Sequence, residues 1–92
     1  MSQTITTATV FLVWDGDSFV CWPNLRVRLA NVNAPERWMP GYDLATQRLT
    51  NLIQGREVLI LPVATDSYGR TVADVYVGTI HVNAAMRGYG YR

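Results

Sequence analysis

Three short polar clusters, each at the end of an apolar run, contain the side chains best suited to catalysis or metal binding. They occupy residues 15–18, 28–36 and 66–70. Hydrolysis of a phosphodiester requires charge neutralisation at the nonbridging oxygens, a base that orients or deprotonates water, and usually a divalent metal ion. The carboxylates and arginines of these clusters could meet in one cleft and supply these functions.

Four side chains in the clusters have complementary chemistry. Asp17 is a hard oxygen ligand suited to calcium, and Glu36 is a carboxylate able to hold water. Arg28 and Arg70 can each fork onto phosphate oxygens. Taken singly, each segment also has a simpler interpretation: a hairpin turn, a rigid turn at Pro35, or a turn with an exposed arginine. Arg28, on the polar face of a strand, could instead pair with Glu36, so the joint pattern is more informative than any one segment.

The elements that must position these clusters follow from the apolar pattern. Runs of β-branched, aromatic and alternating apolar residues predict five strands, at residues 6–14, 18–22, 25–32, 57–64 and 71–77, with a brief extension at 79–82. Apolar residues at helical spacing predict one amphipathic helix over about 43–54, with Asp43 at its start and Gly55 as its stop. Asn83 can cap a short helix that reaches Gly90.

The order of these elements suits an OB-fold barrel. We expect a mainly β (α+β) fold in which five strands form the barrel. The main helix lies between the third and fourth strands, and a short helix follows at the C-terminal end.

Length and composition limit the number of domains and the class of protein. The 92 residues fit one small domain spanning 1–92, and 49% of them are hydrophobic, which is typical of a globular chain. The formal charge is only +1 and all eight basic side chains are arginine, so nucleic-acid binding would depend on a local cluster of arginines.

Cys21, the only cysteine, is expected as a buried thiol in a strand. Residues 1–9 lack the features of a signal peptide and no run reaches membrane-spanning length, so we expect a soluble chain with no membrane partner.

The combined pattern resembles the staphylococcal nuclease-like (thermonuclease) domain family. The family's Asp-Gly-Asp-Thr hairpin, followed by an apolar residue, corresponds to residues 15–19. Its Arg-Leu and Asp-x-Pro-Glu pattern corresponds to residues 28–36, with the spacing between arginine and glutamate unchanged. Its Asp-x-Tyr-Gly-Arg motif is intact at 66–70, and its Val-Asn-x-x-Met-x-x-x-Gly-Tyr helix matches residues 82–91. The four motifs occur in the family's order.

The resemblance implies roles for the residues at the matching positions. Asp17 would bind calcium, with the backbone carbonyl of Ala34 as a further ligand. Glu36 would be the general base acting on water. Arg28 and Arg70 would clamp the scissile phosphate and stabilise the more highly charged transition state.

Nucleotide binding would involve a further set of residues. By resemblance, Asp66 and Tyr68 border the nucleotide pocket, and the tyrosine hydroxyl can reach a phosphate. Aromatic side chains can stack on the bases of single strands, and Trp38, in the loop after Glu36, is the best candidate for this. Trp14 and Trp22 lie in predicted strands, where core packing is the default expectation.

The chain departs from the family pattern at three places. Asn33 stands where the family usually has a second aspartate on the metal; it keeps an oxygen donor but loses one charge, so we expect weakly bound Ca²⁺. Ser67 stands where some members have a phosphate-binding lysine. The sequence ends at Arg92, where the family commonly continues into a third helix, so we expect a short form whose uncovered barrel surface could support self-association.

Three functional interpretations follow. The first is a calcium-dependent, sugar-nonspecific nuclease, with single-stranded DNA or RNA as its partner and a glutamate-activated water as nucleophile. The second is a catalytically weakened or inactive OB-fold module that binds nucleic acid or protein, which Asn33 favours and Glu36 opposes. The third is a truncated or engineered minimal form of a larger nuclease. Family members are often secreted, but the sequence does not specify a compartment.

Overall fold

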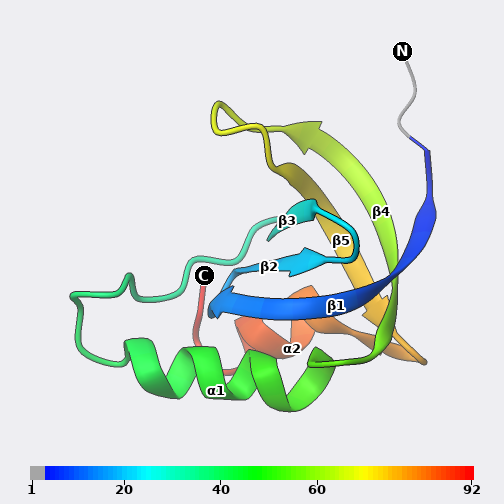
Figure 1. The fold of residues 1–92 in the computed structure, drawn as a ribbon. Coiled ribbons are helices and arrows are strands. Elements are labelled where there is room, and N and C mark those ends of the chain that lie inside the picture. Colours follow the sequence, from blue (N-terminus) through cyan, green and yellow to red (C-terminus); the bar gives the residue numbers. More distant parts are fainter. Residues whose placement is uncertain (1–3) are drawn as a thin grey trace.

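The computed structural model describes residues 4–92 and contains six strands and two helices in those residues (Figure 1). Residues 1–3, which begin the proposed domain and the segment searched for a signal peptide, lie outside the described residues. In chain order, the elements are β1 (Thr6–Asp15), β2 (Ser18–Cys21), β3 (Leu25–Leu29), α1 (Tyr42–Ile53), β4 (Glu57–Thr65), β5 (Thr71–Val77), β6 (Ile80–His81) and α2 (Val82–Gly88).

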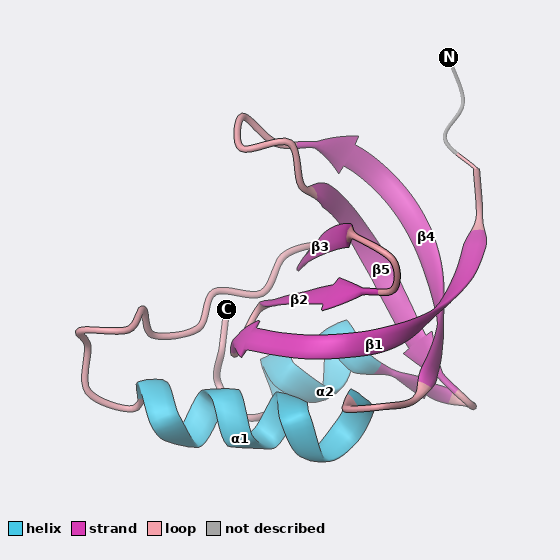
Figure 2. Ribbon diagram, viewed as in Figure 1, coloured by secondary structure: helices cyan, strands magenta, loops and turns pink. Residues whose placement is uncertain are grey.

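The strands close into a barrel (Figure 2). Antiparallel pairing joins β3 to β2, β2 to β1, β1 to β4 and β4 to β5. Parallel pairing of β3 with β5 completes the ring, and β6 extends β5 as a short hairpin. The expected mainly β fold, a five-stranded OB-fold barrel with its main helix between β3 and β4, is confirmed.

Both helices lie on the same side of the barrel (Figure 1), where α1 packs on β1 and α2 packs on β5. The buried face of α1 consists of Ala45, Leu49 and Ile53, which recur every fourth residue and so form one stripe. The helix begins after Gly41 and ends before Gly55, within one residue of the prediction at each end. Gly55 has a φ of 74°, the left-handed conformation that commonly terminates a helix.

Two predicted features near the sheet are wrong. The third strand ends at Leu29 and not at residue 32, because Asn31 adopts a φ of 59°, which interrupts the extended backbone. Asn83 does not cap α2, which ends at Gly88 and has His81 as its N-cap. The Asn83 side chain is instead fully buried and forms three hydrogen bonds inside the protein.

The burial predicted from sequence is confirmed for the cysteine and is wrong for two tryptophans. Cys21 is a buried thiol in β2, as predicted, and burial raises its pKa to about 11, which disfavours the reactive thiolate. Trp14 and Trp22 are not in the core, since 56% and 57% of their surfaces are exposed. Within residues 4–92, no helix combines the length and apolar character needed to cross a membrane.

Candidate active site

The turn between β1 and β2 is held by its own side chains. Asp15 Oδ1 accepts hydrogen bonds from the backbone N–H of Asp17 at 3.0 Å and from Ser18 Oγ at 2.8 Å. Gly16 allows close packing here, because a Cβ at this position would lie 2.6 Å from Ala34 Cβ and 2.7 Å from Ala45 Cβ. The turn therefore touches both the loop after β3 and helix α1.

The predicted metal ligands lie together at this contact. Asp17 is buried, and its Oδ2 atom accepts a hydrogen bond from the Ala34 N–H at 3.0 Å. Burial raises the pKa of Asp17 to about 6 against the opposing effect of the Ala34 hydrogen bond, and the nearby Asp15 carboxylate adds to the increase. Asn33 joins the group through Arg28, whose Nη2 lies 3.0 Å from Asn33 Oδ1 and 3.5 Å from Asp17 Oδ2.

The guanidinium of Arg28 is fixed by the backbone that follows β3. Its Nη1 atom donates hydrogen bonds to the carbonyl oxygens of Leu29 at 2.7 Å and Val32 at 2.9 Å. Its acidic partner is Asp17, so the alternative pairing of Arg28 with Glu36 is wrong. This arrangement places the positive charge of Arg28 against the predicted metal ligands.

The turn between β4 and β5 positions Arg70. Asp66 Oδ2 accepts a hydrogen bond from Arg70 Nε at 2.7 Å, while Oδ1 accepts from the backbone N–H groups of Tyr68 and Arg70, each at 2.9 Å. Desolvation tends to raise the pKa of Asp66, but these hydrogen bonds from Arg70 and Tyr68 outweigh it and lower the pKa below its ordinary value. Asp66 thus orients Arg70, and it lines neither of the two pockets described next.

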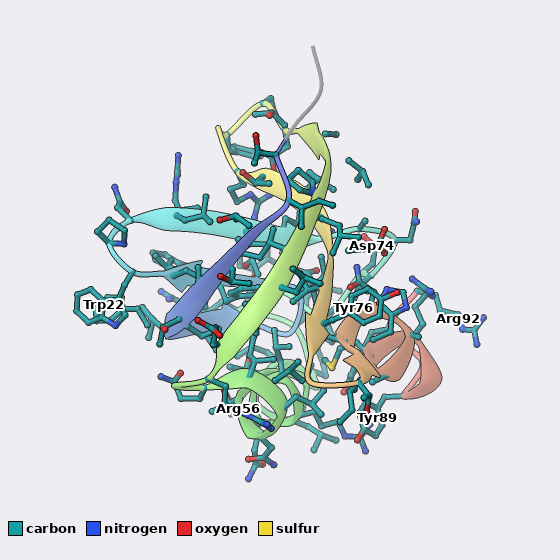
Figure 3. The ribbon with its side chains drawn as sticks, turned by 90° about the vertical axis from the view of Figure 1, so that its right-hand side faces the viewer. Trp22, Arg56, Asp74, Tyr76, Tyr89 and Arg92 are labelled. Atoms are coloured by element: carbon teal, nitrogen blue, oxygen red, sulfur yellow. The ribbon has the colours of Figure 1, made fainter. Side chains whose placement is uncertain are left out.

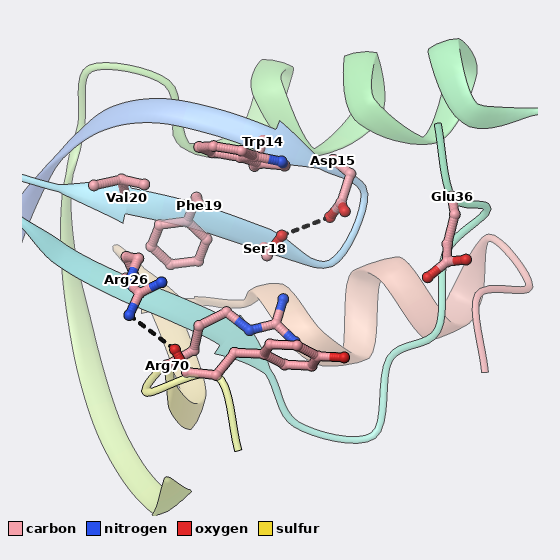
Figure 4. A pocket seen from close by; sticks show the side chains of 9 residues that line it. Trp14, Asp15, Ser18, Phe19, Val20, Arg26, Glu36 and Arg70 are labelled. Carbon is pink, nitrogen blue, oxygen red and sulfur yellow. Dashed lines mark hydrogen bonds between the residues drawn. The ribbon is translucent and has the colours of Figure 1, made fainter. Parts of the chain in front are cut away.

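Two adjacent pockets open beside these turns. The first has a volume of about 330 Å³ and is shown in Figure 4; it is lined by Trp14, Asp15, Ser18, Phe19, Val20, Arg26, Glu36, Tyr68 and Arg70. The second, of about 280 Å³, is lined by Trp14, Asp15, Glu36, Arg37, Trp38 and Tyr42. Glu36 borders both pockets, so a ligand that passes from one to the other would pass its carboxylate.

The predicted residues fall into groups around these pockets. Glu36, Tyr68 and Arg70 line the first pocket, and Trp38 lines the second beside Glu36. The other predicted site residues lie outside both linings; they are Asp17, Arg28, Asn33, Ala34 and Asp66.

The predicted site did not include six residues that line the first pocket: Trp14, Asp15, Ser18, Phe19, Val20 and Arg26. Arg26 could have been found, because strand alternation puts it on the same face as Arg28. The position of Trp14 depends on a register shift in the pairing of β1 with β2, which the local residue types do not specify.

The donor atoms available for a metal ion at this site are few. Among residues 4–92 there is no group of three or more His, Cys, Asp or Glu side chains placed to hold a metal ion. The oxygen donors that meet here are the buried carboxylate of Asp17 and the amide oxygen of Asn33, whereas Ala34 contacts Asp17 through its backbone N–H. Oxygen donors are the type that calcium prefers, and a cation bound here would meet a single carboxylate beside the Arg28 guanidinium, which would weaken its binding.

The raised pKa of Asp17 predicts a pH-dependent gain in stability for Asp17→Asn. The folded protein binds the carboxyl proton of Asp17 more tightly than the unfolded chain does. Proton binding at Asp17 therefore stabilises the folded state at low pH, and this stabilisation is lost as the pH rises through about 6. Without calcium, Asp17→Asn should raise the melting temperature at about pH 7 and have little effect at about pH 4. Glu57→Gln, at an exposed position outside both pockets, is the matched control. Equal shifts for both variants at both pH values would contradict the assignment.

The sequence is similar to those of known proteins. Residues 26–91 match the family described as staphylococcal nuclease homologue. A micrococcal nuclease of Shigella flexneri is 39% identical over 70 residues, covering 73% of this chain and 40% of the relative. An uncharacterized endonuclease of Haemophilus influenzae is 29% identical over 89 residues, covering 92% of this chain and 50% of the relative. The chain therefore spans no more than half the length of either relative.

Proposed function

Because the chain belongs to the staphylococcal nuclease homologue family, we propose that it is a calcium-dependent, sugar-nonspecific nuclease that hydrolyses phosphodiester bonds of DNA and RNA. The observation that carries this proposal is the position of Glu36 at the junction of two pockets, with Arg70 in the wall of the first. A nucleic acid strand that occupies both pockets would place a phosphodiester next to a carboxylate and a guanidinium.

Glu36 is the base in the proposed reaction. Its side chain is exposed, and within residues 4–92 it forms no ion pair, so its oxygens remain available to a water molecule. The carboxylate orients the water and accepts its proton as the oxygen attacks phosphorus. The leaving oxygen departs on the opposite side, as expected for an in-line displacement.

Arg70 and Arg28 supply positive charge to the phosphate. Asp66 holds Arg70 through Nε, which leaves both terminal nitrogens able to contact phosphate oxygens. Arg28 has a more constrained guanidinium, because two backbone carbonyls and Asn33 already accept its hydrogen bonds. We therefore assign the direct clamp on the phosphate to Arg70 and a supporting charge to Arg28.

Calcium, if bound, would be held by Asp17, Asn33 and the carbonyl of Ala34. It would supply Lewis-acid stabilisation of charge on the phosphate oxygens. Glu36 and Arg70 carry out the steps assigned to them above, and Asp66 and Asp15 keep the two turns in place.

Hydrolysis of a labelled single-stranded DNA, with calcium titrated in, tests this proposal. We expect cleavage that requires calcium at high concentration, because the site has one charge fewer than two aspartates would give. Asn33→Asp should increase calcium affinity and the hydrolysis rate, since the added carboxylate attracts the cation more strongly. Asn51→Asp, at an exposed position on α1 outside both pockets, controls for the added charge.

The second candidate is a nucleic-acid-binding module without catalytic activity. One observation favours it: Arg28 lies against both Asp17 and Asn33, where it competes with a cation for their oxygens. In this case DNA binding would be measurable, while neither calcium nor Asn33→Asp would produce cleavage. That result would refute the nuclease proposal and retain the binding function.

A further inference from the structure

Trp14 is held in an unusual position by the pairing of β1 with β2. Val13 pairs with Phe19 and Asp15 pairs with Ser18, so β1 contains one more residue than β2 between these pairs. Trp14 is that extra residue, as in a β-bulge, and bulges often redirect a side chain near a functional site. Trp14 is 56% exposed and lines both pockets.

The backbone of Trp14 is fixed even though its side chain is exposed. Tyr42 Oη, from the start of α1, donates a hydrogen bond to the Trp14 carbonyl oxygen at 2.9 Å. This bond ties the bulge to the helix. The indole is therefore presented to the pockets from a fixed backbone position, which lowers the entropy cost of using it in binding.

The opposite side of the first pocket is cationic and also fixed. Phe19 and Val20, on β2, lie between Trp14 and Arg26 (Figure 4). Arg26 is the register partner of Val20, and its Nη2 atom donates a hydrogen bond to the Tyr68 carbonyl at 2.8 Å. This contact joins the turn that carries Arg70 to the barrel wall, so the pocket has an aromatic side and a positively charged side.

We propose that Trp14 is a base-stacking residue that holds a nucleobase beside the scissile phosphate and selects single-stranded nucleic acid. The inference rests on the proposed function, because Glu36 lines the same pockets as Trp14 and defines where the phosphate lies. Stacking on an aromatic face is tolerant of base identity but needs an unstacked base. A duplex keeps its base faces covered, so Trp14 should not contribute to duplex binding.

The experiment compares Trp14→Leu, which keeps apolar bulk but has no aromatic face, with Trp14→Phe, which keeps a ring. Trp22→Leu is the matched control: Trp22 projects from the surface (Figure 3), is 57% exposed and lines neither pocket. Its ring packs on Phe11, with the ring centroids 4.2 Å apart. All three are made in the Glu36→Gln background. Binding of fluorescein-labelled oligothymidylate, and of a labelled duplex of the same length, is measured by anisotropy with calcium present.

Trp14→Leu should weaken binding of the single strand by about 5- to 150-fold, the range for loss of one base–aromatic stacking contact. Trp14→Phe should retain most of the affinity, and Trp22→Leu should match the parent. Equal affinities of Trp14→Leu and Trp22→Leu for the single strand would overturn the proposal. So would a loss of duplex affinity in Trp14→Leu as large as its loss of single-strand affinity. Failure of the parent protein to bind the single strand would overturn it as well. Failure of the proposed function would be distinct, because it would appear as no hydrolysis by the wild-type protein even when Trp14 affects binding.

Discussion

Replacing Glu36 with glutamine should lower the rate of single-stranded DNA hydrolysis by about 10²- to 10⁴-fold, the usual contribution of a general base. The amide has nearly the same shape as the carboxylate but does not accept the proton of the attacking water. Glu36 is exposed and forms no ion pair within residues 4–92, so the substitution should leave the melting temperature unchanged. Single-turnover cleavage under saturating calcium separates this effect from any change in strand binding.

Glu57→Gln is the matched control for this prediction. It makes the same chemical change at an exposed position at the start of β4, away from both pockets. The two variants have the same net charge, so a general electrostatic effect on DNA affinity should be similar in both. If Glu36→Gln cleaves as fast as Glu57→Gln, the assignment of Glu36 as the base is wrong.

Asn83→Ala should lower the free energy of unfolding by about 2–5 kcal/mol, a large fraction of the total for a small protein. Asn83 Oδ1 accepts a hydrogen bond from the Val75 N–H at 2.8 Å, and Nδ2 donates to the carbonyls of Ala30 and Ala73, each at 3.0 Å. The variant would leave the Val75 N–H and the Ala30 carbonyl without these partners in a site that is fully buried. Urea unfolding followed by circular dichroism measures the change.

Asn51→Ala provides the comparison, since Asn51 is exposed on α1. Its expected effect is small, because alanine favours the helix and no buried partner is lost. Hydrogen exchange adds a local readout: the Val75 amide should exchange faster in Asn83→Ala, relative to other amides of β5. A similar stability for the two variants would show that the Asn83 hydrogen bonds contribute little.

Much of the fold could be predicted from sequence because its signals are local. The helical spacing of Ala45, Leu49 and Ile53 and the stop at Gly55 place α1 to within one residue. Alternation at 25–29 gives the inward and outward faces of β3, including the outward position of Arg28. Glu36 and Arg70 line one pocket, as expected, although closure of the barrel and not their spacing along the chain brings them together.

The set of elements, their order and the residue types available for chemistry follow from the sequence alone. The tertiary structure set the long-range partners: Arg28 contacts Asp17 and not Glu36, and Asn83 joins β5 to the segment after β3. It also decided that Trp14 faces the pockets, because the register between two strands creates the bulge. Local propensity acts over a few neighbouring residues, whereas register and buried hydrogen bonds join residues far apart in the chain and form only when the barrel closes.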